Sequence, residues 1–333
     1  MNNPELTICL VTYNGGSYLP HCLNSVFKQS FKGWQLLIMD NGSNDDSAKI
    51  GAELTGGDSR AILLPPQEKN IGFAKGYNNL IKKVDSKYII LLNQDVILEP
   101  DYVEKIVDFL DKNPKSGAVI GKILRWNLIE SGELTNVSKT SNIDTAGLGI
   151  FSSFRIVDVG SGERDSGQFN NNEKIFGVSG CLPAYRKEAL DQAGYFDNKF
   201  FSYKEDVDLA FRLNNFGWES HRVGGAVAYH ERSAPDKESS SDIKIAFNRK
   251  IKSEFTRYLS YRNHWYVLIK NIALTDCMRY GIFMFWYELK KFIYILLFEQ
   301  KTLLAWVDIF KNLLVLLKQR RKVKLKSVKK FIK

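Results

Sequence analysis

The chain begins with short apolar runs that alternate with segments of helical spacing, and this alternation constrains the fold more than any other feature. In residues 17–29, for example, apolar side chains recur on one face of a helix. Strands separated by helix-length segments predict an α/β fold with a mainly parallel central sheet and helices on both faces. The strand-like runs occupy residues 6–14, 34–40, 61–64 and 87–95, with a further candidate at 118–124.

Regular structure is harder to predict in the middle of the chain. Residues 125–173 are polar, weakly periodic and rich in Gly, Ser and Asn. A loop region of this length inside a folded domain is often functional, so we expect it to cover a site or to meet a second substrate. Order returns in residues 174–197, where a strand leads into a helix that ends at Gly194.

Length and cysteine usage favour an intracellular globular protein. A chain of 333 residues buries a substantial core in one large domain or two modest ones. Its four cysteines lie far apart and form no CxxC pair, which fits a reducing compartment. The N-terminus has no charged leader before an apolar core, as a signal peptide would have. We therefore expect a cytoplasmic location.

The net charge of +10 is concentrated at the end of the sequence. Residues 311–333 carry ten Lys or Arg and no acid, so the rest of the chain is formally neutral. These basic residues follow a strongly apolar run at 280–298, which Glu288, Lys290 and Lys291 interrupt. A helix that spans a bilayer needs about 20 largely uncharged residues, so this run is better suited to lie on a membrane than to cross it.

An apolar region followed by basic residues is typical of a segment that binds anionic lipid. We therefore expect residues 266–333 to form an amphipathic, helical, basic region that holds the protein on the inner face of the cell membrane, with no nucleic acid as a partner. The alternative is a pair of core helices followed by a solvated basic tail.

Polar residues follow three of the predicted strands, in the sequences VTYN (11–14), MDNGS (39–43) and LLNQD (91–95). In a parallel α/β sheet the ligand lies beyond the carboxyl ends of the strands, so we expect these residues to share one crevice. Asp40 is suited to accept hydrogen bonds from a nucleotide base. Asp95 is suited to Mg²⁺ or Mn²⁺ on a diphosphate, because these cations prefer oxygen ligands.

The loop NIGFAKGYN (70–78) is a further candidate for nucleotide binding. Gly72 allows close backbone approach, whereas Asn70 and Asn78 offer polar side chains to ribose or phosphate. The sequence contains no GxxxxGKS/T, no GxGxxG after the first strand and no GxSxG. It therefore disfavours a P-loop NTPase, a dinucleotide-binding domain and a hydrolase with a nucleophile elbow.

Taken in order, the motifs resemble the family 2 glycosyltransferases, which have the GT-A fold, and within them the rhamnosyltransferase-like branch. The resemblance covers about the first 265 residues and implies a GT-A domain at 1–265. Its nucleotide-sugar half is expected at about 1–124 and its acceptor and catalytic half at about 174–265, followed by the C-terminal region at 266–333. The motifs that carry it are VTYN, MDNGSNDDS, NIGFAKGYN, LLNQDV, GYFDNKFFSYKEDVDLAFRLNNFGW, AVAYH and YRNHW.

The resemblance implies a nucleotide-diphosphate sugar as donor, either a dTDP- or a UDP-sugar, and a divalent cation, Mg²⁺ or Mn²⁺. Asn93 stands where the family has the first acid of its DxD motif, and Asp95 stands at the second acid. His230 matches a later histidine that completes the coordination in similar enzymes, so Asp95 and His230 are the implied metal ligands. The residues implied to bind the donor nucleotide are Thr12, Tyr13, Asn14, Asp40, Asn70, Gly72, Asn78, Asn93 and Gln94.

Asp206 matches the catalytic base of the family. A sugar hydroxyl is a poor nucleophile at neutral pH, so an inverting transferase needs a carboxylate to take its proton. Helix geometry places Asp206 and Asp208 on nearly opposite sides and Glu205 and Asp208 on a common face. The helix dipole in the first turn is expected to keep Asp206 ionised.

The neighbours of Asp206 are expected to support the acceptor. Glu205 and Asp208 are assigned to orient the acceptor sugar or to hold Arg212, and Trp218 is assigned to stack on a sugar face.

The predicted function is an inverting, metal-dependent glycosyltransferase that extends a surface polysaccharide or a lipid-linked oligosaccharide. Similarity favours dTDP-L-rhamnose as donor, and a polyprenyl-diphosphate-linked glycan as acceptor would explain the C-terminal region. One alternative is a non-catalytic sugar-nucleotide or polysaccharide-binding protein with a decayed transferase fold, which Asn93 supports. A nucleotidyltransferase is a third hypothesis, but the first strand is not followed by a Gly-rich basic loop.

Overall fold

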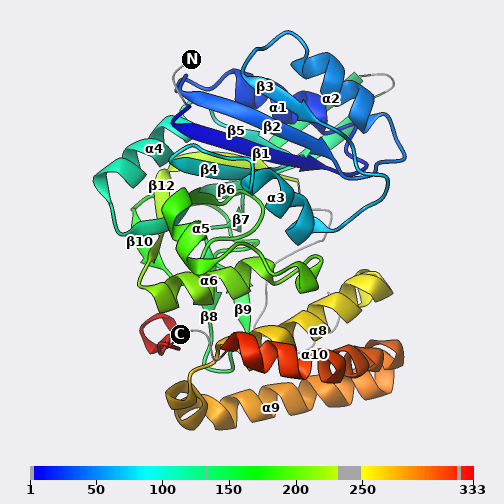
Figure 1. Cartoon of the computed structure of the whole chain (residues 1–333), viewed down its shortest axis with the longest axis vertical. Helices are drawn as coiled ribbons and strands as arrows, with labels where there is room; N and C mark the ends of the chain where they lie inside the picture. The colour runs from blue at the N-terminus through cyan, green and yellow to red at the C-terminus, as the bar shows by residue number, and fades with distance from the viewer. Residues whose placement is uncertain (1–3, 132–133, 232–248, 321–323) are drawn as a thin grey trace.

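The computed structural model describes residues 4–131, 134–231, 249–320 and 324–333, whose arrangement is drawn in Figure 1. The strands are β1 (Leu6–Thr12), β2 (Trp34–Asp40), β3 (Ala61–Leu64), β4 (Tyr88–Asn93), β5 (Val96–Leu98), β6 (Ser116–Ser131), β7 (Leu134–Thr145), β8 (Leu148–Ile150), β9 (Ile156–Asp158), β10 (Glu173–Ile175), β11 (Ala184–Arg186) and β12 (Glu219–His230). The helices are α1 (Leu19–Phe27), α2 (Ser47–Thr55), α3 (Phe73–Ile81), α4 (Tyr102–Lys112), α5 (Lys187–Ala193), α6 (Glu205–Phe216), α8 (Glu254–Asn271), α9 (Leu274–Phe298) and α10 (Ala305–Arg320), with 3₁₀ turns η1 (Asn198–Phe200), η2 (Gln300–Leu304) and η3 (Lys329–Phe331).

The first half of the main sheet is parallel, as the strand and helix alternation predicts. β4, β1, β2 and β3 lie side by side in that order and run the same way. In the register of β1, Thr12 is opposite Asp40 of β2, and Val11 is opposite Asn93 of β4. The carboxyl ends of three strands therefore meet at one edge, where a ligand is expected.

The second half of the sheet is mixed. β11 runs antiparallel between β4 and β6, whereas β12 runs parallel to β6 and carries β5 and β10 as antiparallel neighbours. β12 is long because it continues from the end of α6 across the sheet to His230. This strand brings the histidine of the AVAYH motif to the β5 edge, where His230 is opposite Val96.

The expectation of weak structure at 125–173 is only partly right. β6 continues to Ser131 and pairs with β7 in a long hairpin, and β8 and β9 form a separate two-stranded sheet. These strands escape prediction because they bury polar side chains: Asp144 and Thr145 of β7 are 1% and 0% exposed. Alternation of apolar and polar residues is then lost although the strand is regular.

Helix α6 joins two apolar cores. Leu209 and Leu213 pack into the core of the main sheet, whereas Val207, Ala210 and Phe211 pack into a second core beneath it. Val207, Ala210 and Phe211 thus form one apolar stripe of α6. In Figure 1, α8, α9 and α10 lie below α6 as a helical layer.

The C-terminal region is largely helical, with α9, η2 and α10 after α8. None of the helices in the described ranges is long and apolar enough to cross a membrane. The end of the basic run packs on the catalytic part of the chain, since the Lys333 amide donates to Ile150 O at 3.0 Å. Arg321 and Lys322, two members of that run, lie outside the described residues.

Candidate active site

A pocket of about 320 Å³ opens at the carboxyl ends of β1, β2 and β4. Its far wall comes from the loop before α6 and from the start of α8, through Phe201, Ser202, Tyr203, Phe255, Thr256 and Leu259. Its near wall contains six residues that the sequence assigns to donor or metal binding: Tyr13, Asn70, Gly72, Asn93, Gln94 and Asp95. The structure therefore brings six of the eleven residues predicted for donor or metal binding to the lining of one pocket.

Gln94 holds the end of β1 in place. Its Oε1 accepts hydrogen bonds from Thr12 Oγ1 at 2.7 Å and from the Tyr13 amide at 2.8 Å, and its Nε2 donates to Tyr13 O at 3.1 Å. Thr12 is itself buried and does not line the pocket. Asn14 lies outside the lining as well, where its Oδ1 accepts from the Asn44 amide at 2.8 Å. Thr12 and Asn14 thus shape the loop behind the pocket.

Asp40 ends β2 in a tight turn and keeps one oxygen for a ligand. Its Oδ1 accepts from the amides of Gly42 at 3.0 Å and Ser43 at 2.9 Å. Its Oδ2 is buried and has no hydrogen-bond partner within the described ranges. A buried carboxylate oxygen without a donor is costly, so this atom is suited to a base N–H.

The assignment of Asn78 to ribose or phosphate is wrong. Its side chain is buried, donates to Phe196 O and Asn198 Oδ1 at 2.8 Å each, and accepts from the Phe196 amide at 3.1 Å. Asn78 therefore ties α3 to the segment that precedes α6. A loop asparagine looks the same in a sequence whether its amide faces a ligand or another loop.

Asp95 lines the pocket and faces His230, which lies outside the pocket lining. His230 Nε2 lies 3.3 Å from Asp95 Oδ1, and His230 Nδ1 lies 2.8 Å from Asp144 Oδ2. Two ligand atoms on one Mg²⁺ or Mn²⁺ at about 2.1 Å lie about 3 Å apart, so the Asp95–His230 spacing fits a shared cation. Burial lowers the pKa of His230, but Asp95 and Asp144 outweigh it and raise the pKa to about 10. The site therefore favours positive charge.

Asp144 is a functional candidate that the sequence analysis missed. It is 1 % exposed and fixes the imidazole of His230 through Nδ1, as carboxylates next to metal-binding histidines commonly do. Asp144, Cys181 and His230 also bring ligand atoms within 4.8 Å of one another. A thiolate is a poor ligand for Mg²⁺ or Mn²⁺, so we assign the cation face to Asp95 and His230 Nε2. No local motif marks Asp144, which lies in the weakly periodic segment.

Asp206 stands in the first turn of α6 beside the pocket. Its Oδ2 accepts from the Gly180 amide at 2.9 Å, and its Oδ1 accepts from the Val207 amide at 2.7 Å. A Cβ atom placed on Gly180 would lie 3.5 Å from both Asp206 Oδ2 and Phe73 Cζ, and Phe73 lines the pocket. The next residue, Cys181, belongs to the cluster with His230. Gly180 and Cys181 thus connect the candidate base to the candidate metal ligands.

The two acids at the start of α6 do not titrate like exposed carboxyls. Burial raises the pKa of Asp206, and the charge of Asp158 raises it further. Burial also raises the pKa of Glu205 well above its usual range, and the charge of Asp206 adds to this. The helix dipole therefore does not set the pKa of Asp206, because burial and the Asp158 charge outweigh it and raise that pKa above its ordinary value.

Asp208 and Arg212 are structural. Asp208 is fully buried and accepts from Arg212 Nε, Lys270 Nζ and Asn271 Nδ2, each at 2.9 Å. Burial opposes its charge, but Lys270 and Arg212 hold the pKa of Asp208 well below its usual range. Arg212 also donates to the carbonyls of residues 193–195. The predicted separation of Asp206 from Asp208 on α6 is confirmed by these different partners.

Trp218 does not reach the pocket, which corrects its assignment to a sugar face. Its Nε1 donates to Gln192 Oε1 of α5 at 3.1 Å, and its side chain covers Gly117. The residue supports the packing of α5 and does not line the pocket.

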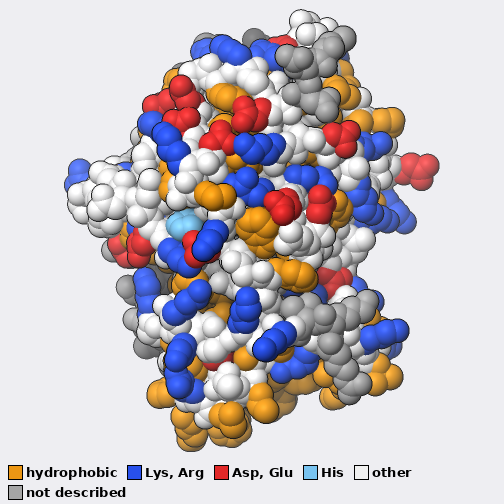
Figure 2. All heavy atoms as spheres, turned by 60° about the vertical axis from the view of Figure 1, so that its left-hand side comes forward, with side chains coloured by type: hydrophobic (Ala, Val, Ile, Leu, Met, Phe, Trp, Pro, Cys, Tyr) orange, Lys and Arg blue, Asp and Glu red, His pale blue; other side chains and the backbone are white. Residues whose placement is uncertain are grey.

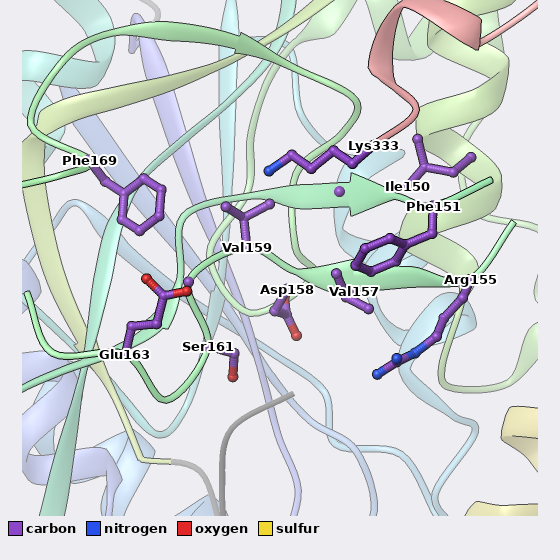
Figure 3. A pocket seen from close by; sticks show the side chains of 12 residues that line it. Ile150, Phe151, Arg155, Val157, Asp158, Val159, Ser161, Glu163, Phe169 and Lys333 are labelled. Atoms are coloured by element: carbon purple, nitrogen blue, oxygen red, sulfur yellow. The ribbon is translucent and has the colours of Figure 1, made fainter. Parts of the chain in front are cut away.

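A second cavity of about 220 Å³ lies along β8 and β9 and is completed by Lys333 (Figure 3). Phe151 and Phe169 stand on two sides of it in the close view. None of the predicted site residues lines this cavity. Its lining includes Asp158, which the sequence analysis does not single out. Next to burial, the charge of Asp158 is a second cause that raises the pKa of Asp206, so this cavity carries a group that acts electrostatically on the candidate base.

Comparison with known proteins agrees with this geometry. Residues 7–194 match the family model described as Glycosyl transferase family 2. An N-acetylglucosaminyl-diphospho-decaprenol L-rhamnosyltransferase of Mycobacterium tuberculosis is 24% identical over 241 residues, which cover 68% of this chain and 76% of that protein. A poly-beta-1,6-N-acetyl-D-glucosamine synthase of Staphylococcus epidermidis is 24% identical over 214 residues, which cover 64% of this chain and 47% of that protein.

Two solved structures share the fold. GalNAc-T7 with UDP, GalNAc and Mn²⁺ has a TM-score of 0.59 at 13% identity, over 81% of this chain and 48% of that chain. The mannosyltransferase PcManGT from Pyrobaculum calidifontis with GDP-Man and Mn²⁺ has a TM-score of 0.55 at 13% identity, over 93% of this chain and 76% of that chain. The α/β architecture with its mainly parallel central sheet is therefore GT-A-like.

Proposed function

The chain belongs to glycosyl transferase family 2, whose model matches more than half of its residues, and it is a glycosyltransferase; from this premise we propose that it is an inverting, metal-dependent enzyme. It moves a hexosyl group from a nucleotide-diphosphate sugar to a hydroxyl of a glycan. The observation that carries the proposal is the Gly180–Cys181 connection, where Gly180 contacts Asp206 and Cys181 adjoins His230. A base and a cation site on two sides of one pocket are what such a transfer requires.

The donor nucleotide is assigned to the near wall of the pocket. Tyr13 and Asn70 line it, Gly72 permits close backbone approach, and Asp40 Oδ2 is suited to the base. The donor proposed is dTDP-L-rhamnose, which the name of the mycobacterial relative supports, with a UDP-sugar as the alternative.

The acceptor hydroxyl is assigned to the side of Asp206. As the hydroxyl oxygen bonds to the anomeric carbon, its proton passes to the Asp206 carboxylate and the bond from that carbon to the diphosphate breaks. A raised pKa suits this role, because a general base works best with a pKa near the working pH. When bound by Asp95 and His230, Mg²⁺ or Mn²⁺ would supply positive charge near the departing diphosphate.

A membrane location is part of the proposal and is supported by the outer surface of the helical layer. We call this surface the apolar face. Its exposed large apolar side chains are Leu274, Met278, Ile282, Phe283, Phe285, Trp286, Phe292, Ile293, Leu296, Leu297, Phe298, Leu304, Val307, Phe310, Leu314 and Val315. Figure 2 shows hydrophobic side chains gathered at the lower end of the molecule, with Lys and Arg side chains above them. Soluble monomers rarely expose a patch of this extent, so it calls for a partner.

Charge on the helical layer favours an anionic lipid surface as that partner. The four acids of residues 274–320 are all bonded to other parts of the chain. Asp276 accepts from the Val328 amide, Glu288 pairs with His264, Glu299 with Arg249, and Asp308 with Arg262. The exposed charges that remain on α9 and α10 are basic: Arg279, Lys290, Lys311 and Lys318. Basic residues beside an apolar surface suit the anionic inner leaflet.

A lipid-linked acceptor follows from the same arrangement. The far wall of the pocket includes Tyr203 and Phe255, which are 44% and 57% exposed. Phe255 begins α8, and α8 packs on α10 through Trp265 and Trp306 at 5.0 Å between ring centroids. The acceptor side of the pocket is therefore built on the layer that carries the apolar face. A polyprenyl-diphosphate-linked glycan is the acceptor class that fits.

The test is a screen of nucleotide sugars for release of nucleoside diphosphate, with and without acceptor lipid. We expect release that depends on one donor, on a divalent cation and on acceptor. Asn93, which replaces an acid, favours a second candidate, a protein that binds sugar nucleotides without transfer. Donor binding without release across the whole panel would favour that candidate and contradict the proposed transfer.

A further inference from the structure

The loop that leads into α6 has an unusual backbone. Phe201, Tyr203 and Lys204 have φ angles of 63°, 70° and 71°, a region that side chains with a Cβ atom rarely adopt. Each costs about 1–2 kcal/mol relative to the ordinary right-handed region, so the surroundings must hold them there. Phe201 and Tyr203 line the pocket, and the chain continues directly into Glu205 and Asp206. The conformation of this loop therefore sets both the acceptor wall and the candidate base.

Asn263 of α8 holds this loop from below. Its side chain is fully buried, and the two N–H groups of Nδ2 are shared among three carbonyls: Phe200 O at 2.9 Å, Ser202 O at 2.9 Å and Tyr203 O at 2.7 Å. Three carbonyls converge on one nitrogen because the positive φ angles turn the loop tightly around it. A buried carbonyl left without a donor would cost about 1–3 kcal/mol, so the amide and the loop conformation depend on each other.

Arg262 reinforces the same contact. Its Nε donates to Asn263 Oδ1 at 3.0 Å, which fixes which end of the amide faces the loop. Its Nη2 donates to Lys199 O at 2.9 Å and Phe200 O at 3.2 Å. Five hydrogen bonds thus run from the two residues to the carbonyls of the segment from Lys199 to Tyr203.

The opposite side of the loop touches the donor wall. Phe201 O accepts from the Ala74 amide at 3.0 Å, and a Cβ atom on Gly72 would lie 2.6 Å from Phe201 Cδ2. The loop is therefore held between α8 and the segment that carries Gly72. A shift of the loop would move the acceptor wall and the first turn of α6 together.

We propose that Asn263 is a positioning residue for transfer, which holds the loop in its left-handed conformation so that Asp206 faces the acceptor hydroxyl. This inference rests on the proposed role of Asp206. Asn263 lies in α8, outside residues 7–194 that match the family model. Its contribution is made through the loop, without contact to the reacting groups.

The first experiment replaces Asn263 by Asp, which keeps the shape but turns a donor toward three carbonyls into an acceptor. We expect kcat to fall roughly 100-fold, as misplacement of a reacting group by about 1 Å does, with the KM for donor changed less than about 3-fold. Amide exchange of residues 199–206 should speed up. The matched control is Asn312→Asp on α10, where the Asn312 amide donates to Tyr266 OH and Asp308 O. It should leave kcat and loop exchange near those of the parent enzyme.

A second experiment separates positioning from a general role in packing. Lys204→Gly removes the Cβ penalty at φ 71°, so it should restore kcat roughly 3-fold or more when combined with Asn263→Asp. Lys204→Gly alone corrects for the lost lysine charge, which completes a double-mutant cycle. The proposal would be overturned if the fold-losses in kcat of the two single variants multiplied in the double variant and if amide exchange of residues 199–206 stayed unchanged.

The design also keeps this inference apart from the proposed function. If Asn263→Asp does not fold, Arg262→Gln removes two bonds to the loop and should lower kcat more than donor affinity; an unchanged kcat would overturn the proposal. If Asp206→Asn abolishes transfer while Asn263→Asp keeps full kcat, the positioning role is wrong and the transferase mechanism stands. If Asp206→Asn keeps its turnover, the proposed mechanism itself is wrong.

Discussion

Asp95 and His230 face each other across 3.3 Å between Oδ1 and Nε2, although Asp95 lies in the turn between β4 and β5 and His230 ends β12. Asp144 Oδ2 holds the other imidazole nitrogen at 2.8 Å. The imidazole is therefore oriented from behind, and its free nitrogen is directed at the carboxylate that would share a cation.

Replacement of Asp144 by Asn should weaken metal binding without removing a proposed ligand. Loss of the carboxylate behind a metal-binding histidine typically costs about 10- to 100-fold in affinity. The measurement is Mn²⁺ titration by calorimetry on the full chain. The control is Asp165→Asn, which removes a buried partner of Lys122 in the same segment and should leave Mn²⁺ affinity unchanged. Equal affinities for parent and Asp144→Asn would argue against the site.

Replacement of Asp206 by Asn should suppress transfer and spare the donor. A positioned general base contributes about 10²- to 10⁴-fold to the rate, and the near wall of the pocket is untouched by the change. Turnover is followed as nucleoside diphosphate release, and donor affinity by calorimetry. Glu188→Gln, an exposed change on α5, serves as control. A variant that keeps most of its turnover would place the base elsewhere.

The pH dependence of transfer should respond to Asp158. Burial and the Asp158 charge raise the pKa of Asp206, and the base is the ionised form. Activity is therefore fully present above the raised pKa and is lost as the pH falls through it. Asp158→Asn removes one of the two causes and should move the acid limb of kcat/KM to lower pH.

The acid limb of the kcat/KM profile reports the titration of Asp206 and Glu205 together, because the charges of these neighbours interact. Glu163→Gln removes a charge from the same second cavity and provides the comparison. An acid limb that stays in place after Asp158→Asn would contradict the assigned electrostatics.

Stability should depend strongly on Asp208. Asp208→Asn leaves Lys270 and Arg212 without their buried carboxylate, and breaking such a pair costs about 3–5 kcal/mol. Because the folded pKa of Asp208 is depressed, its contribution is present above the ordinary value of about 3.9 and is lost as the pH falls below it. Urea unfolding measures the change. Asp191→Asn breaks an exposed pair with Lys187 and should cost less than about 1 kcal/mol.

Binding to membranes should depend on the apolar face. Phe285→Glu and Trp286→Glu replace side chains that are 58% and 56% exposed, so the fold should tolerate them. Each should weaken binding to vesicles that contain phosphatidylglycerol at least about 10-fold, since an inserted aromatic side chain contributes about 1.5–3 kcal/mol. Co-sedimentation measures the loss. Phe216→Glu on α6, 45% exposed, is the control, and equal losses in all three variants would count against a specific face.

The sequence predicts best where burial is uniform. Strands such as β1, with Leu6, Ile8 and Leu10 all fully buried, form continuous apolar runs, and their polar ends locate the pocket. The start of α6 is also predicted, because three acids occupy its first turn and the apolar residues that follow recur at the spacing of a helix.

The sequence fails where the partner of a polar side chain decides its role. Asn70 and Asn78 belong to one predicted loop, yet Asn70 lines the pocket whereas Asn78 lies in α3 and bonds to Phe196. β7 and its residue Asp144 lie in a polar segment. The partners of this segment are β6 and His230, which are too far away in the sequence for a short-range pattern to reveal them. The raised pKa of Asp206 likewise comes from burial and from the charge of Asp158, a residue distant in the chain.

Helix α8 spans Glu254–Asn271, so the predicted boundary at 265 falls inside it, between Asn263 and Lys270. Asn263 bonds to the loop before α6, and Lys270 bonds to Asp208 within α6. Chimeras that swap acceptor preference between relatives would therefore mismatch these contacts if they were joined at 265. A junction at Ile272 or Ala273, where α8 has ended, would keep α8 and the loop before α6 from the same parent protein.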